Sequence, residues 1–257
     1  MVELSGVSLS YADKSKGKVS ALRQINARFE EGNFYAIIGP SGCGKTSLIK
    51  IIAALIPPSE GSVSVAAKPL CGIRARTSVI FQDYGLLPWK TVRANAELPL
   101  RIKGRVTHDD RQKVQALLAE FGLDSFAGRY PSQLSGGMKQ RLAIVRSLAS
   151  SPELLLMDEP FSSLDSLTRE DAQDFLLTVQ REHRLTIIMI THSIEEAVYL
   201  ADAVYVMNGV NPGSITERIT ISRDENAPRA SFRGDPRFHE YCGVLRQACR
   251  PLSRKGD

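Results

Sequence analysis

Eight residues between an apolar run and a helix-forming segment constrain the fold more than any other part of the chain. Residues 39–46 read Gly-Pro-Ser-Gly-Cys-Gly-Lys-Thr and match the pattern G-x-x-x-x-G-K-[ST]. The apolar run at 33–38 predicts a buried strand before the loop, and residues 45–55 predict a helix after it. Flexible glycines let such a backbone wrap around a phosphate, with the amides of the helix start pointing inward. The segment therefore predicts a phosphate-binding loop inside an α/β fold.

Two side chains of this loop suit the phosphates of a nucleotide. Lys45 can neutralise negative charge on the β- and γ-phosphates, and the Thr46 hydroxyl can ligate Mg²⁺. The alternative interpretation is a glycine-rich turn before a basic helix start. The strand–loop–helix context favours the phosphate loop.

A second loop follows another apolar run and carries two acidic residues. Residues 154–157 are apolar and lead directly into Asp158 and Glu159. Because the carboxyl ends of parallel strands meet at one edge of a sheet, Asp158 is placed to hold Mg²⁺ beside the phosphate loop. Glu159 is placed to polarise an attacking water. Taken alone, the same residues also fit an ordinary acidic junction between a strand and a loop.

Hydrophobic periodicity predicts alternating strands and helices with one helical interruption. We expect strands at residues 1–11, 19–29, 33–38, 77–81, 153–158, 185–190 and 204–207. Helices are expected at 166–183 and 194–200. Residues 91–150 are helical and charged, and they interrupt the alternation as an inserted subdomain. Alternating strands and helices favour a mainly parallel sheet covered by helices.

The composition excludes several other classes of protein. The 257 residues include 43% hydrophobic and 24% charged residues, as in soluble globular proteins. A net charge of +5 permits an anionic ligand or an acidic membrane surface but is too small to indicate nucleic-acid binding. We find no apolar run near the roughly 18 residues of a membrane span, and we expect no secretory signal. The four cysteines form no C-x-x-C pair and are expected to be free thiols in a reduced cytosol.

Residues 134–141, Leu-Ser-Gly-Gly-Met-Lys-Gln-Arg, connect these separate motifs. Together with the phosphate loop (Walker A) and Asp158–Glu159 (Walker B), this signature resembles the ABC ATPase family, whose motifs occur here in the family order. Further matches are Tyr11 (the aromatic residue that stacks on adenine), Gln82 (Q-loop), Ser162–Asp165 (D-loop) and His192 (switch histidine). The resemblance covers about residues 1–221. For Tyr11, packing at the end of a strand is the alternative interpretation.

The resemblance implies a fold and a domain organisation. We expect an α/β phosphate-loop NTPase fold of the RecA-like type, with a mainly parallel sheet as its core. An antiparallel β subdomain lies at the amino terminus, and the α-helical subdomain at about 91–150 is inserted into the core. Residues 1–221 form the ABC ATPase domain, and 222–257 form a partly helical carboxyl-terminal tail.

The resemblance also implies the cofactors ATP and Mg²⁺ and the residues around them. It assigns catalytic roles to Lys45, Gln82, Glu159 and His192. It assigns Mg²⁺ to Thr46, Gln82 and Asp158. It places ATP against Tyr11, Gly39, Pro40, Ser41, Gly42, Cys43, Gly44, Lys45, Thr46, Ser47, Ser135, Gly136 and Gly137.

The signature predicts a second anion site and a partner subunit. Ser135, Gly136 and Gly137 precede a helical run, so their amides and the helix dipole can bind an anion. In the family, two subunits pair head to tail, and the signature of one caps the γ-phosphate held by the other. The resemblance therefore implies a homodimer with two ATP molecules between its subunits.

Cys43 lies inside the phosphate loop at a helix amino terminus. That setting can lower a thiol pKa and leave the thiol accessible, so we expect Cys43 to be the thiol whose alkylation stops activity. The alternative is a small residue that fills space.

The residues after Gln82 indicate the kind of ABC ATPase. Leu86, Leu87, Pro88 and Trp89 form an apolar patch that, in family terms, lines the groove for a cytoplasmic helix of a membrane subunit. The alternative is core packing of the helical subdomain. The segments Leu-Leu-Pro-Trp-Lys-Thr-Val and Leu-Asp-Ser-Leu-Thr-Arg are similar to bacterial importer ATPases for nitrate, sulfonate, taurine and related compounds.

This resemblance implies membrane-spanning permease subunits as partners and, through them, a solute-binding protein. Such a subunit would lie on the cytoplasmic face of a bacterial inner membrane. The alternative is a soluble ABC ATPase without a role in transport. The chain has no long coiled-coil or zinc insert, as in DNA-repair ABC proteins, and no second cassette, as in translation-associated ones. A phosphate-loop kinase or GTPase would lack the signature and the switch histidine.

Overall fold

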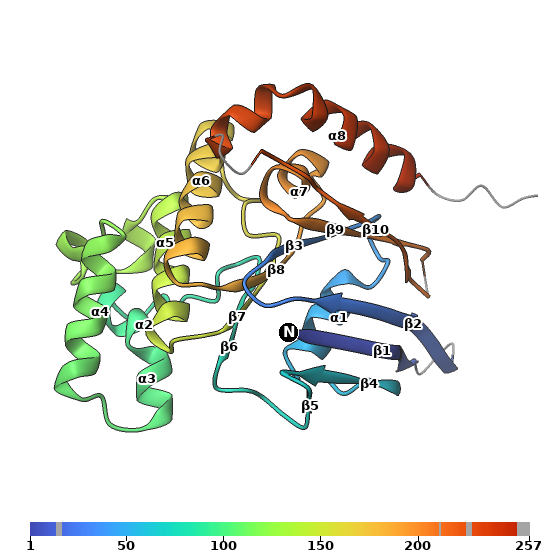
Figure 1. The fold of residues 1–257 in the computed structure, drawn as a ribbon. Coiled ribbons are helices and arrows are strands. Elements are labelled where there is room, and N and C mark those ends of the chain that lie inside the picture. Colours follow the sequence, from blue (N-terminus) through green and yellow to red (C-terminus); the bar gives the residue numbers. More distant parts are fainter. Residues whose placement is uncertain (14–16, 211, 225–227, 251–257) are drawn as a thin grey trace, which may run out of the picture.

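The computed structural model describes residues 1–13, 17–210, 212–224 and 228–250 (Figure 1). Within these residues the main sheet has six strands in the order β10-β9-β3-β8-β7-β6. Neighbouring strands are parallel except β10, which runs antiparallel to β9 at one edge. The strands are β3 (Phe34–Ile38), β6 (Thr77–Ile80), β7 (Leu154–Asp158), β8 (Thr186–Ile190), β9 (Ala203–Asn208) and β10 (Ser214–Thr220). The predicted mainly parallel α/β core is confirmed.

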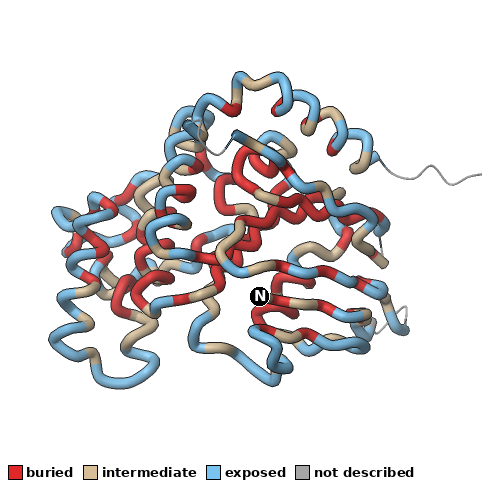
Figure 2. Tube along the Cα trace, in the orientation of Figure 1, coloured by how far each residue is buried: buried red, intermediate tan, exposed pale blue. Residues whose placement is uncertain are grey.

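A second, antiparallel sheet packs beside the first. It consists of β1 (Val2–Asp13), β2 (Gly17–Phe29), β4 (Glu60–Val65) and β5 (Lys68–Pro69), in the order β2-β1-β4-β5. Helix α1 (Lys45–Ile52) lies between the two sheets, and its Leu48, Ile49, Ile51 and Ile52 join one buried cluster with residues of both (Figures 1 and 2). The helix ends before the predicted residue 55, because Ala54 adopts a left-handed φ of 57°.

The helical subdomain is inserted between two neighbouring strands of the main sheet. It leaves β6 and returns at β7, which pair in parallel. It contains α2 (Val92–Ala96), α3 (Leu98–Lys103), α4 (His108–Glu120) and α5 (Gly136–Ala149) and forms a separate lobe in Figure 1. Val114, Leu118 and Leu142 are buried in this lobe and belong to the main core cluster. The lobe is therefore packed on the sheet through a continuous apolar interface.

The remaining helices cover the carboxyl-terminal part of the sheet. They are α6 (Ser166–Glu182), α7 (Ile194–Leu200) and α8 (Pro236–Ala248), which lies over α7 and the β9–β10 edge (Figure 1). Arg223 and Arg229 donate hydrogen bonds to the last carbonyls of α7, and Phe232, Phe238 and Leu245 are buried in the main core. Among the described helices, none is long and apolar enough to cross a bilayer.

Candidate active site

The phosphate loop follows β3, whose five residues are all buried. Two of its glycines cannot carry a side chain. A Cβ on Gly39 would lie 2.3 Å from the Met207 carbonyl oxygen, and one on Gly44 would lie 2.5 Å from Leu22 Cδ2. Gly44 also adopts a left-handed φ of 92°, which favours glycine. The tight turn after β3 therefore depends on glycine at both positions.

The start of α1 is free to bind an anion. Gly44 is the N-cap and makes no side-chain capping bond, and the first turn holds no acidic residue. The first amides of a helix lack acceptors inside the helix, and the macrodipole adds partial positive charge there. The backbone from Gly44 to Ser47 therefore offers a cluster of donors to a phosphate.

Lys45 folds back over the loop that precedes it. Its Nζ donates to the carbonyl oxygens of Gly39 at 2.8 Å and Pro40 at 3.0 Å. The ammonium group therefore lies across the mouth of the loop, where its charge faces the space that a phosphate would enter.

Asp158 ends β7 beside the first turn of α1. The residue is 8% exposed, and its carboxylate accepts a hydrogen bond from the Thr46 side chain. Burial raises the pKa of Asp158, and the Thr46 hydrogen bond opposes the shift. Carboxylate and hydroxyl oxygens are the ligand types that Mg²⁺ prefers, so this pair fits that ion.

Glu159 and His192 come together from the ends of two neighbouring strands. His192 Nδ1 lies 3.2 Å from Glu159 Oε2, and the Glu159 amide donates to the Ile190 carbonyl at 3.0 Å. Glu159 has a left-handed φ of 50°, which is rare for a residue with a side chain and occurs most often at functional sites. Its carboxylate is mostly shielded, whereas 68% of the histidine side chain is exposed.

Two further predicted residues lie at the periphery of this site. The Tyr11 hydroxyl is within 3.1 Å of Ser47 Oγ, and Tyr11 is 44% exposed. Strand β1 continues to Asp13, so Tyr11 does not close the strand, and its ring is not packed in a strand-end core. Gln82 is exposed two residues after β6, at the same edge of the sheet as Asp158.

The signature residues begin α5, in the helical lobe rather than at the phosphate loop (Figure 1). Ser135 Oγ accepts from the Met138 amide at 3.3 Å and so caps the helix. A Cβ on Gly136 would lie 3.1 Å from Leu164 Cδ2, and one on Gly137 would lie 3.0 Å from Thr168 Cγ2. Both glycines therefore let α5 approach the segment that opens α6.

The burial and the thiol pKa of Cys43 differ from what the sequence predicts. Its side chain is fully buried in the cluster that contains α1, with Sγ 3.8 Å from Lys45 Nζ. Burial raises the pKa of the Cys43 thiol, and the nearby Lys45 charge opposes the shift. The expectation of a reactive thiol is wrong because the neighbouring backbone closes over the residue.

The residues that close over Cys43 were missed by the sequence analysis. A Cβ on Gly213 would lie 1.9 Å from the Cys43 carbonyl oxygen, so the segment before β10 presses against the loop. Gly213 also exchanges backbone hydrogen bonds with β2, at 3.0 Å each. The Pro-Gly pair at 212–213 signals a turn but not its distant contact.

Alkylation is therefore expected to leave the phosphate loop unaffected. Cys71 is the exposed cysteine, whereas Cys43 and Cys242 are buried and Cys249 is partly buried. Because thiols react as exposed thiolates, N-ethylmaleimide should modify Cys71 and lower the predicted ATP hydrolysis by less than about 10%. Mass spectrometry locates the adduct, and Cys71→Ser should abolish it. Inactivation that accompanies labelling of Cys43 would contradict this expectation.

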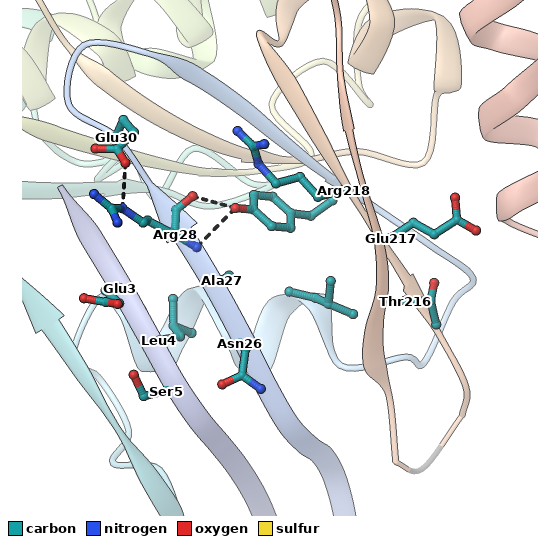
Figure 3. Close-up of a pocket in the computed structure, with 12 residues that line it drawn as sticks. Glu3, Leu4, Ser5, Asn26, Ala27, Arg28, Glu30, Thr216, Glu217 and Arg218 are labelled. Atoms are coloured by element: carbon teal, nitrogen blue, oxygen red, sulfur yellow. Dashed lines mark hydrogen bonds and ion pairs between the residues drawn. The ribbon is translucent and has the colours of Figure 1, made fainter.

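A groove of about 740 Å³ lies elsewhere, between β2 and β10 (Figure 3). The Tyr205 hydroxyl reaches the Arg28 backbone at its floor, accepting from the amide at 3.1 Å and donating to the carbonyl at 2.5 Å. On its rim, Arg28 pairs with Glu30 at 2.6 Å. None of the predicted site residues lines this groove.

The fold and the site define a phosphate-loop nucleoside triphosphatase. A family model described as "ABC transporter" matches residues 22–162. The chain is 39% identical to the nitrate import ATP-binding protein of Synechocystis sp., over 97% of this chain and 95% of that protein. It is 38% identical to the taurine import ATP-binding protein of Yersinia pestis, over 93% and 92%.

Solved structures show the same relationship. A dimeric bacterial ABC transporter cassette superimposes with a TM-score of 0.75 and 31% identity, covering 87% of this chain and all of that one. A post-hydrolysis state of that cassette, bound to ADP and phosphate, gives a TM-score of 0.74. The chain therefore belongs to the ABC transporter family. It is an ATPase.

Proposed function

We propose that the protein is the ATP-hydrolysing subunit of an ABC importer and couples hydrolysis to uptake of a small solute. The observation that carries the proposal is near-complete alignment with two import ATP-binding proteins. Those relatives act in nitrate and taurine import, so nitrate, a sulfonate, taurine or a related compound is the proposed class of substrate. We also propose residues 1–221 as the ATPase domain, with the helical subdomain at 91–150, and 222–257 as a tail.

The site geometry supports specific roles for the predicted residues. Lys45 and the amides of residues 39–47 bind the phosphates, and Tyr11 stacks on adenine. Asp158, Thr46 and Gln82 hold Mg²⁺, which when bound neutralises phosphate charge. Glu159 accepts a proton from the attacking water, and His192, 3.2 Å from it, orients the carboxylate and faces the γ-phosphate.

The position of the signature supports the proposed homodimer. Ser135, Gly136 and Gly137 begin a helix of the helical lobe, whereas the phosphate loop joins β3 of the main sheet to α1. We propose that these residues cap the ATP held by a second subunit. The dimeric form of the similar cassette supports this arrangement.

The segment between β6 and α2 supports a membrane partner. Leu86 packs against the main core, but Trp89 is 71% exposed. Asn95 fixes this segment, donating to the Leu87 carbonyl at 3.1 Å and accepting from the Leu87 amide at 2.8 Å. A large aromatic side chain held outward on a fixed loop is typical of an interface anchor. We propose that it docks a permease subunit at the cytoplasmic face of a bacterial inner membrane, with a solute-binding protein on the far side.

Reconstitution tests the importer function. The protein is co-expressed with candidate permease subunits and placed in proteoliposomes with their solute-binding protein, and ATPase rate and solute uptake are measured. We expect nitrate, taurine or a sulfonate to stimulate both. Full ATPase activity with no permease that copurifies or stimulates it would instead favour a soluble ABC ATPase.

Trp89→Ser should weaken association with the permease by about tenfold or more, because it removes a central aromatic anchor. The same variant should keep the ATPase rate of the isolated subunit within about twofold, since Trp89 is exposed and distant in sequence from the phosphate loop. Pull-down of tagged permease measures the association. Unchanged association would place the anchor elsewhere.

A further inference from the structure

Arg169 and Glu196 lie outside the proposed ATP site, but they contact segments that contain residues of that site. Glu196 lies in the first turn of α7 and is 8% exposed, and Arg169 lies in the first turn of α6. Arg169 Nε lies 3.7 Å from Glu196 Oε1. A carboxylate with so little exposure requires compensation by hydrogen bonds and opposite charge, and Arg169 supplies the charge at ion-pair distance without a hydrogen bond from Nε.

Glu196 holds the segment that contains the histidine. The Thr191 hydroxyl donates to Glu196 Oε2 at 2.5 Å and accepts from the Ser193 amide at 3.0 Å. Ser193 Oγ accepts from the Glu196 amide at 3.1 Å. Of the two neighbours of His192 in the chain, Thr191 is therefore bonded to the Glu196 carboxylate directly, and Ser193 is linked to it through the Thr191 hydroxyl.

Arg169 holds the segment that contacts the signature. Its Nη2 donates to the Leu164 carbonyl at 2.7 Å. The Leu164 side chain lies against Gly136, where a Cβ would approach it to 3.1 Å. Because the guanidinium is a rigid planar fork, a shift of Leu164 displaces the group that pairs with Glu196.

We propose that the Arg169–Glu196 pair couples the signature to His192, so that the histidine's position responds to what the signature binds. Arg169 and Glu196 are thus positioning residues for ATP hydrolysis. In the proposed dimer, where each signature caps the partner's ATP, this coupling links the two ATP sites within one subunit. The inference rests on the proposed role of His192.

Three variants test the coupling: Arg169→Met, Glu196→Gln and the double variant Arg169→Met/Glu196→Leu. Each single variant should lower kcat about tenfold and change KM for ATP by less than about twofold, since nucleotide contacts remain while the reacting geometry is lost. The double variant should be no less active than the worse single variant, as expected for residues that act through one another.

The double variant also separates positioning from folding. Replacing both charges by apolar groups often restores the stability that breaking one partner removes. We expect thermal unfolding near that of the unmodified protein together with kcat still about tenfold low. Hydrogen exchange should show faster exchange at 191–193. A stable double variant with normal kcat would overturn the coupling.

Glu195 provides the matched control on the same helix. It pairs with Arg246 of α8 at 2.5 Å and accepts from the Ser193 hydroxyl at 3.3 Å, but both charged side chains are more than half exposed. Within the residues that the structure describes, Glu195 makes no hydrogen bond or ion pair with Thr191 or Arg169. Glu195→Gln should therefore leave kcat within about twofold. An equal loss in this variant would overturn the proposal. His192→Ala tests the proposed function separately: normal hydrolysis there removes the role of the histidine, whatever the Glu196 variants do.

Discussion

Glu159→Gln is expected to bind ATP normally and to hydrolyse it at least about 100-fold more slowly, because general-base assistance is worth that much or more. Glutamine keeps the shape of the side chain and its contact with His192 but cannot accept the proton. The left-handed φ of 50° at this position costs glutamine no more than glutamate. Since hydrolysis should release the dimer, the variant should accumulate as an ATP-bound dimer.

Size-exclusion chromatography with ATP and Mg²⁺, together with phosphate release, measures this outcome. Glu153→Gln is the control. Glu153 lies just before the first residue of β7, at the end of the strand away from Glu159, and pairs with Arg76 and Arg74 there. A monomeric Glu159→Gln protein that hydrolyses ATP at the normal rate would show that another group activates the water.

Lys45→Ala and Ser135→Arg should each lower activity by at least about 100-fold, the usual cost of losing a preorganised charge or donor at a transition state. Lys45→Ala removes the ammonium group held above the loop by Gly39 and Pro40. Ser135→Arg removes the cap of α5 and fills the space before its amides. In the proposed dimer, each ATP site combines the phosphate loop of one subunit with the signature of the other. Lys45→Ala therefore damages one half of a site and Ser135→Arg damages the other half.

Mixing the two inactive proteins tests that arrangement. A heterodimer would contain one site with both lesions and one with neither. An equal mixture should therefore regain about a quarter of the unmodified activity, since half the dimers are mixed and each has one intact site of two. Each variant incubated alone is the control. If exchange of subunits is verified and no activity returns, the shared site is wrong.

The parts of the site that the sequence predicts are those set by local pattern and by parallel-sheet geometry. The loop at 39–46 is encoded by its own residues. The approach of Glu159 to His192 follows because both stand at the carboxyl ends of strands, and β7 and β8 prove to be neighbours. The burial of Cys43 was not predictable, because Gly213, far along the chain, packs against its backbone.

Hydrophobic periodicity also failed to predict two polar strands, β4 and β10. Strand β4 begins in a segment that reads as turn residues, and its Glu60, Gly61 and Ser62 are exposed. Strand β10 is a polar edge strand with mixed exposure, so it shows no clear alternation. Both are strands because a neighbour supplies hydrogen bonds, and tertiary context of that kind overrides weak propensity.

Because the helical lobe is one continuous insertion between β6 and β7, it can be exchanged between relatives as a single segment of chain. The chain departs after Ile80 and returns at Leu154, while Ile80 pairs with Met157 and Thr77 with Leu154. The chain thus leaves at the carboxyl end of β6 and returns at the amino end of its parallel neighbour β7, and Arg146 of α5 donates to the Tyr84 and Gly85 carbonyls at 2.6 Å each. Grafting residues 81–153 from a relative would therefore exchange Trp89 and the signature together. Recognition of the permease and of the second subunit's nucleotide can then diversify as one inherited unit, while the phosphate loop stays unchanged.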